Sequence, residues 1–168
     1  ADFYSGTSAD TQFNLKGDGN AYADGSWSGG GADYAEYFEW ADGNSSNQDR
    51  VGYSVSLVNN KIKIAESGET VIGVISGNPA VVGDNSWNSW KDKYQKDDYG
   101  RYILDSDGYR TPNSDYDDSL TYIPREERKE WDVVGLMGKL RIKKGQQTNS
   151  SWIKMRDISD SVEEWLVK

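Results

Sequence analysis

Hydrophobic and polar residues alternate with a period of two along much of the chain, which predicts β-strands. Residues 51–57 (VGYSVSL) and 61–65 (KIKIA) alternate on either side of a VNN turn and predict a β-hairpin. Residues 70–77 (TVIGVISG) form an apolar run typical of a buried strand, and residues 133–142 (VVGLMGKLRI) predict the last clear strand. The pattern therefore predicts a mainly β fold with short helices, rich in hairpins.

Two segments account for the helices in this prediction. Residues 85–98 place aromatic side chains at helical spacing, which favours a short helix or an aromatic-rich loop. In residues 160–168, Asp160 and Glu163 have the spacing of a capping box ahead of an apolar face. We therefore expect a short amphipathic helix at the C-terminal end of the sequence.

A glycine- and serine-rich stretch divides the pattern into two parts. Residues 11–27 predict a hairpin, because Phe13 and Leu15 alternate before a GDGN turn. So short a unit has little to bury by itself, and it resembles the last turn of a repetitive β-structure. We predict the end of a β-stalk over residues 1–28 and a separate domain over residues 29–168.

Composition adds an expectation about assembly. Of the 168 residues, 35% are hydrophobic, yet the chain has 7 Trp and 11 Tyr. Few apolar residues with many large aromatics are typical either of a turn-rich β protein or of a folded unit whose core is partly shared between chains. The formal net charge of -9 opposes binding to a nucleic-acid backbone. No apolar run reaches the roughly 20 residues that a membrane-spanning helix needs, so we expect neither nucleic acid nor a membrane as a partner.

Cysteine and histidine are both absent from the sequence. Thiol nucleophiles, disulfides, histidine bases and most zinc or haem sites are thereby excluded, which leaves carboxylates, hydroxyls, lysines and tyrosines for any chemistry. The acidic stretches at residues 42–49 and 105–108 lack the spacing of a calcium loop and are typical of Asx turns. We expect no cofactor and no metal.

The segment GGGADYAEYFEW, residues 29–40, sets three acidic residues among aromatics. In a helix, Asp33, Glu36 and Glu39 would share one face. In a strand, Glu36 would lie on an aromatic face, where desolvation raises the pKa of a carboxyl, and Asp33 would stay nearer solvent and ionised.

Two carboxyl groups in unlike environments are sufficient for acid–base hydrolysis without histidine. An aspartate beside a peptide bond already has a high effective concentration, and the glycines at 29–31 permit an unusual backbone path. The segment is therefore consistent with self-cleavage just before Asp33. The alternative is an edge strand that shows its acids to water and its aromatics to the core.

The residues themselves resemble a known family. The blocks GADYAEYFEWADGN, DRVGYSVSL, IGVISGNPAVVGD, EWDVVGLMGKLRI and WIKMRDISDSVEEWLVK are similar to the peptidase G2 family. Members are intramolecular-chaperone and autoproteolytic-cleavage domains at the C-terminus of bacteriophage tailspike and neck-appendage proteins. The resemblance implies a homotrimer that brings the upstream β-helical stalk of the same chain into register and then cuts itself off, in a virion component made in the host cytoplasm.

The resemblance also implies a site. The scissile bond of cleaving members lies between a serine and an aspartate, and a glutamate three residues later assists. On this sequence the bond is Ala32–Asp33, with Asp33 and Glu36 as catalytic residues and Glu39 as a second acid, in a glutamic-type endopeptidase acting once in cis. Ala32 departs from the serine of the pattern. A non-cleaving structural or receptor-binding fibre tip is the first alternative, and a carbohydrate-binding module is the second.

Overall fold

The computed structural model describes residues 2–5, 10–17, 19–86 and 93–168. Its contacts divide the chain into two compact units, Ala1–Gly30 and Gly31–Lys168. Each unit has its own β-sheet.

The first unit is a three-stranded antiparallel sheet in the order β1-β2-β3. Its strands are β1 (Asp2–Ser5), β2 (Asp10–Leu15) and β3 (Ala21–Ala23). The predicted hairpin between β2 and β3 is confirmed, with Phe13 opposite Ala23. The ring of Trp27 packs edge-on against Phe13, with the centroids 5.2 Å apart. That this unit ends a stalk remains a prediction.

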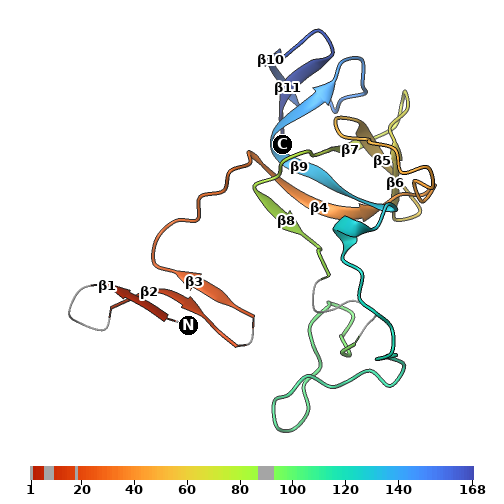
Figure 1. Ribbon diagram of the computed structural model, residues 1–168. Coiled ribbons are helices and arrows are strands. Elements are labelled where there is room, and N and C mark those ends of the chain that lie inside the picture. The colour runs from red at the N-terminus through yellow and green to blue at the C-terminus, as the bar shows by residue number, and fades with distance from the viewer. Residues whose placement is uncertain (1, 6–9, 18, 87–92) are drawn as a thin grey trace. The chain divides into compact units, whose positions relative to one another are not determined.

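The second unit is built on a larger sheet in the order β10-β11-β9-β7-β5-β6, and β4 pairs with both β9 and β8 (Figure 1). The strands are β4 (Asp33–Glu39), β5 (Ser54–Val58), β6 (Lys61–Ile64), β7 (Val71–Ile75), β8 (Val81–Gly83), β9 (Trp131–Lys143), β10 (Ile153–Asp157) and β11 (Val162–Val167). The predicted β5–β6 hairpin and the buried strand β7 are confirmed, as is the mainly β fold class.

The sheet curls because the end of β4 meets β6. Trp40 forms a parallel bridge with Ile62, whose carbonyl oxygen accepts the N–H of Ala41 at 2.9 Å. One core cluster lies within this curve: Trp40, Val55, Ile62, Ile75 and Val134. A second cluster lies towards β11: Ala65, Val71, Val74, Leu140, Ile142, Trp152 and Val167. Burial of these apolar side chains supplies the main driving force for folding.

The expected C-terminal helix over residues 160–168 is wrong. The chain there forms the hairpin of β10 and β11, and β11 pairs with residues 138–143 of β9. β9 extends past the residues that pair with β7, so the backbone groups of its second half need a partner, and β11 provides them. That demand outweighs the local helical pattern.

Trp87 and Trp90 of the other expected helix, in residues 85–98, lie outside the described residues. Tyr94, at its end, is not helical but forms an antiparallel bridge with Pro112. Within the described ranges the helical structure is a short 3-10 turn over Arg125–Glu127. No helix there is long and apolar enough to cross a membrane.

Candidate functional site

The acidic–aromatic segment is a strand, β4, and its side chains alternate between two faces. Asp33 and Ala35 are buried on one face, whereas Glu36 is half-buried on the other. Ala32, just before the strand, is exposed. The sequence leaves helix and strand open, and the structure selects the strand.

The peptide bond between Ala32 and Asp33 is held by two neighbouring segments. The backbone N–H of Lys139 in β9 donates to the carbonyl oxygen of Ala32 at 3.2 Å. On the other side, the N–H of Ala80 donates to the carbonyl oxygen of Asp33 at 2.8 Å. The carbonyl groups of Ala32 and Asp33 are therefore both held by hydrogen bonds from parts of the chain that are distant in sequence.

Glycines allow this close approach. Gly138 faces Asp33 across the β4–β9 pair, and a Cβ there would lie 2.4 Å from the Ala32 oxygen. Its φ of +117° is also one that side chains disfavour. At Gly31, a Cβ would lie 2.3 Å from the carbonyl carbon of Pro79. A side chain at either glycine would displace the bond.

The carboxyl group of Asp33 faces the interior. Only 5% of Asp33 is exposed, and its Oδ2 has no hydrogen-bond partner among the described residues. Gly135 leaves room for this oxygen, since a Cβ there would lie 2.7 Å from it. Burial raises the pKa of Asp33, and an interaction with the Ser76 side chain offsets part of the rise.

The expectation that Asp33 stays nearer solvent and ionised is therefore wrong. Strand alternation separates Asp33 from Glu36 correctly, but it does not say which face turns inward. That choice is made by the packing of β4 against β9, where Gly135 and Leu140 receive the Asp33 face. The residue whose burial favours a bound proton is Asp33.

Glu36 lies on the opposite face of β4 from Asp33. Its Oε1 accepts a hydrogen bond of 2.5 Å from the hydroxyl of Tyr34. That bond is the main cause that raises the pKa of Tyr34. Gly83 in β8 makes room, because a Cβ there would lie 2.6 Å from the Tyr34 hydroxyl. Within one chain, Asp33 and Glu36 are not brought together.

Glu39 lies at the far end of β4. Six residues of extended strand separate it from Asp33, a distance of about 20 Å. Its carboxylate forms an ion pair of 2.7 Å with Lys61 on β6. In one chain this residue ties β4 to β6 and does not approach the Ala32–Asp33 bond.

Three residues that position the Ala32–Asp33 bond are not among the site residues predicted from the sequence: Gly135, Gly138 and Lys139. They follow Asp33 by more than a hundred positions, and only the β4–β9 pairing brings them to it. A usable signal was present, because glycines inside a predicted strand mark a bulge or a close backbone approach. The β4–β9 register shifts at Tyr34 and Ala35, beside these glycines.

Comparison with protein families gives a match that spans nearly the whole chain. The model of Peptidase_G2, the IMC autoproteolytic cleavage domain, matches residues 7–165. The match includes Ala32, Asp33 and the part of β9 that holds them.

Curated relatives come from phages and from a bacterium. The chain is 38% identical over 120 residues to the preneck appendage protein of Bacillus phage PZA, which covers 67% of this chain and 14% of that protein. The pre-neck appendage protein of Bacillus phage phi29 matches with the same identity and the same coverage of both chains. The phage-related protein YobO of Bacillus subtilis is 32% identical over 127 residues, covering 69% of this chain and 15% of YobO. The chain thus spans about a seventh of the length of these relatives.

Two solved structures share the fold. The pre-mature bacteriophage phi29 gene product 12 matches 95% of this chain and 25% of its own, with a TM-score of 0.81 and 30% identity. The C-terminal fragment of the same gene product matches 81% of this chain and all of its own, with a TM-score of 0.66 and 31% identity. The arrangement of strands that holds the Ala32–Asp33 bond therefore belongs to a fold already seen in a phage protein.

Proposed function

This chain belongs to the Peptidase_G2 family, and we propose on that premise that it cleaves itself once between Ala32 and Asp33. The observation that carries the proposal is the buried Asp33 carboxyl beside a peptide bond whose carbonyl accepts the N–H of Lys139. The two groups give the bond a reacting carboxyl and a donor for developing negative charge.

Asp33 supplies the reacting group. An oxygen of its carboxyl bonds to the carbonyl carbon of Ala32, closing a six-membered ring, and the bond from that carbon to the Asp33 nitrogen breaks. The nitrogen takes the proton of the carboxyl and becomes a free amine. Water then hydrolyses the anhydride that joins Ala32 to the Asp33 side chain, which restores the Asp33 carboxyl. The raised pKa keeps the required proton available at higher pH than for an exposed aspartate.

The backbone of β9 supplies the second element. When the ring closes, the carbonyl oxygen of Ala32 gains negative charge, and the N–H of Lys139 already points to it at 3.2 Å. A fixed donor of this kind costs no reorganisation during the reaction. Because β4 and β9 are far apart in the sequence, this donor is present only after the domain has folded.

The two glutamates have different places in the proposal. Within one chain, Glu36 accepts a hydrogen bond from Tyr34 and Glu39 forms an ion pair with Lys61. Neither glutamate therefore lies beside the Ala32–Asp33 peptide bond. A proton-transfer role for Glu36 therefore requires a neighbouring copy of the chain, and Glu39 serves to hold β4 to β6.

The proposed setting is a trimeric virion component. The relatives include appendage proteins of Bacillus phages, and this chain matches a small part of each. We propose that three copies associate, that this association brings the upstream stalk of each chain into register, and that cleavage then separates the stalk from the domain. Exposed apolar side chains on the domain support association, among them Val81, Met137 and Ile153.

Intact-mass measurement of three variants tests the assignment of roles. Asp33→Asn is expected to stay full-length, because an amide cannot form the anhydride. Glu39→Gln is expected to cleave as the parent does. Glu36→Gln is expected to cleave slowly if a neighbouring copy uses Glu36. Cleavage of Asp33→Asn at the parent rate would remove Asp33 from the mechanism.

The second candidate function is a non-cleaving fibre tip with the same fold. Ala32 favours it, because the family pattern has serine at this position. Comparison of the parent with Ala32→Ser separates the two candidates. Cleavage of the serine variant alone would assign the parent to the non-cleaving class, whereas similar cleavage of both would show that the hydroxyl is not needed.

A further inference from the structure

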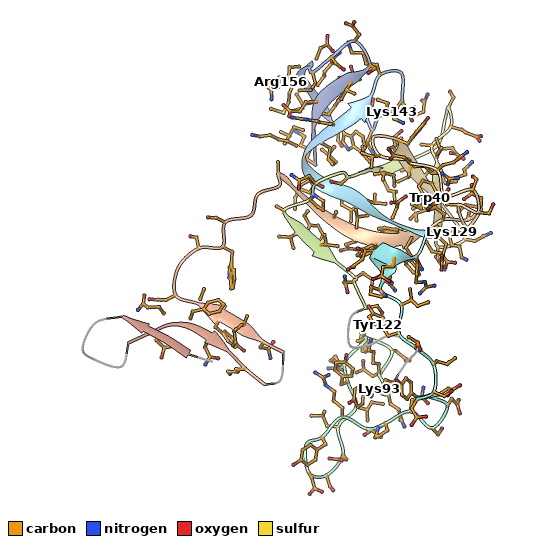
Figure 2. All side chains as sticks on the ribbon, in the orientation of Figure 1. Trp40, Lys93, Tyr122, Lys129, Lys143 and Arg156 are labelled. Atoms are coloured by element: carbon orange, nitrogen blue, oxygen red, sulfur yellow. The ribbon has the colours of Figure 1, made fainter. Side chains whose placement is uncertain are left out.

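The long connection between β8 and β9 contains an eight-residue repeat. Three consecutive segments align without gaps: residues 93–100 (KYQKDDYG), 101–108 (RYILDSDG) and 109–116 (YRTPNSDY). Lys93, labelled in Figure 2, begins the first of them. The fifth position of every repeat is an aspartate or an asparagine: Asp97, Asp105 and Asn113. A fixed period indicates that one structural unit is used several times.

Each repeat forms the same turn around its fifth residue. The side-chain oxygens of Asp97, Asp105 and Asn113 accept the backbone N–H two residues further along, at 2.9, 3.0 and 3.2 Å. Their carbonyl oxygens accept the N–H three residues further along, at 2.9, 3.1 and 3.2 Å. These contacts are those of an Asx turn. The three repeats therefore share one local structure as well as one sequence pattern.

Backbone hydrogen bonds join the three repeats into a closed ring, the three-repeat ring. Their third residues bond in a cycle, because Ile103 donates to Gln95 at 3.0 Å, Thr111 donates to Ile103 at 2.9 Å, and Gln95 donates to Thr111 at 3.0 Å. The fifth residue of each repeat likewise donates to the first residue of the next, and Asn113 closes this second cycle on Lys93 at 3.0 Å. Each repeat is thus bonded to both of the others, and the chain returns to its starting point.

The second residues of the repeats, Tyr94, Tyr102 and Arg110, pack against one another. The two aromatic rings lie edge to face with their centroids 6.0 Å apart. The Arg110 guanidinium lies 4.0 Å from the centroid of Tyr102 and 5.7 Å from that of Tyr94. All residues of the three-repeat ring are described and none is buried, so apolar burial contributes little to it. The cation–π contacts of Arg110 reach both other repeats and so help to hold the ring closed.

The two ends of the long connection are held by contacts of their own. Asp84 directly follows β8, and Arg125 begins the 3-10 turn ahead of β9. These two residues are 41 positions apart and form an ion pair of 2.7 Å. The Arg125 guanidinium also stacks on the ring of Trp131 in β9, 3.8 Å from its centroid. The base of the connection is therefore closed without the three-repeat ring.

We infer that the three-repeat ring is a separate cooperative unit, which orders the long connection by itself and opens without disturbing the β-sheet. Among the described residues, its backbone hydrogen bonds begin and end within the ring. Segments whose contacts are mostly internal open and close as units with a free energy of their own. A connection of this length is uncommon unless it has structure of its own, and the ring supplies that structure. The inference does not depend on the self-cleavage proposed above.

Amide hydrogen exchange of the full 168-residue Asp33→Asn chain, followed by NMR, tests the cooperative unit. The N–H groups of Gln95, Ile103 and Thr111 are expected to have similar protection factors, because one opening exposes all three. Arg110→Gln is expected to lower all three about tenfold and to leave the amides of β9 unchanged. The inference is overturned if Arg110→Gln leaves the three protection factors as they are, or if it lowers those of β9 equally.

The matched control is Arg101→Gln in the same chain. Arg101 forms an ion pair of 2.7 Å with Asp97 and lies 5.3 Å from the centroid of the Tyr99 ring, so its side chain contacts the turn of one neighbouring repeat. We expect the protection of Ile103 and Thr111 to change by about twofold at most. A loss as large as that in Arg110→Gln would overturn the role given to Arg110, because any lost charge would then open the ring.

A deletion tests whether the β-sheet needs the three-repeat ring. Lys93 and Asn113 are hydrogen-bonded to each other, so removal of residues 94–112 joins two ends that already lie together. At the same protein concentration, we expect the urea midpoint of this deletion variant of Asp33→Asn to match that of the full-length Asp33→Asn chain. A deletion variant that does not fold, or whose midpoint falls, would overturn the inference, since the sheet would then depend on the ring.

Discussion

At the scale of the residue, Asp33 is a carboxyl group placed where its charged form is disfavoured. Burial raises its pKa from an ordinary value of 3.8, so the folded state holds its proton more tightly than the unfolded chain does. The stability that this group contributes is fully present below the unfolded pKa and is lost as the pH rises through the folded pKa. This is the reverse of the usual behaviour of an aspartate in an ion pair.

The substitution Asp33→Asn removes this pH dependence. We expect uncleaved parent protein to lose stability relative to Asp33→Asn as the pH rises above about 4, and the variant to be at least as stable as the parent at neutral pH. Urea unfolding at several pH values and a fixed protein concentration measures the difference. A variant whose disadvantage grows with pH would show that the Asp33 carboxylate is stabilised in the fold.

A second prediction concerns Gly138. Alanine there would place a Cβ 2.4 Å from the Ala32 oxygen at a φ of +117°. We expect Gly138→Ala to destabilise the domain by about 2 kcal/mol or more and to slow cleavage, because the Ala32 carbonyl must move away from Lys139. Urea unfolding and intact mass report the two effects.

Gly145→Ala is the control for backbone strain alone. Gly145 also has a positive φ, +83°, but a Cβ there meets nothing within 4 Å. Its loss of stability is expected to be smaller, and its cleavage rate unchanged. Equal effects of the two substitutions would mean that contact with Ala32 is unimportant.

At the scale of the element, β9 organises the second unit. It pairs with β4 and β7 along its first half and with β11 along its second. The site at Ala32 lies near the point where these pairings change over, at Gly138, which pairs with both Asp33 and Val167. The geometry of the bond therefore depends on the correct register of β9.

Sequence patterns predict the elements whose signal is local. The β5–β6 hairpin has alternation on both sides of its turn, and β7 is a continuous apolar run, so both were predictable. The β10–β11 hairpin was not, because residues 160–168 carry a helix-like cap pattern and are strands only through pairing with β9. Asp33 and Glu36 could be named as candidates from the sequence, but the burial of Asp33 and the approach of Gly138 result from long-range packing.

A side-chain hydrogen bond joins Trp40, just after β4, to Asp132 at the start of β9. The Trp40 indole N–H donates to Asp132 at 2.8 Å, and burial raises the pKa of Asp132. Trp40→Phe is expected to cost about 1–3 kcal/mol for the lost hydrogen bond, in addition to the loss of packing. A double-mutant cycle with Asp132→Ala, measured by urea unfolding, isolates the bond. Strictly additive effects would contradict a direct interaction.

For the whole molecule, we expect several copies of the chain to associate. The chain of 18.8 kDa leaves Val81, Met137, Ile153 and Met155 exposed on one domain. We expect light scattering of the uncleaved Asp33→Asn variant to give a mass of three chains in solution, because association covers such surface. A monomer at micromolar concentration would contradict the trimer and favour a binding module that acts alone.

The proposed reaction should follow folding, because the Lys139 N–H reaches the Ala32 carbonyl only when β4 and β9 pair. The most direct test is the intact mass of the chain recovered from inclusion bodies, dissolved in denaturant and then refolded, with Asp33→Asn treated in parallel. We expect a full-length chain before refolding and, afterwards, two fragments, the second beginning at Asp33, while Asp33→Asn stays whole. A refolded parent that keeps its full-length mass, or that is cut at another bond, would contradict the proposed reaction.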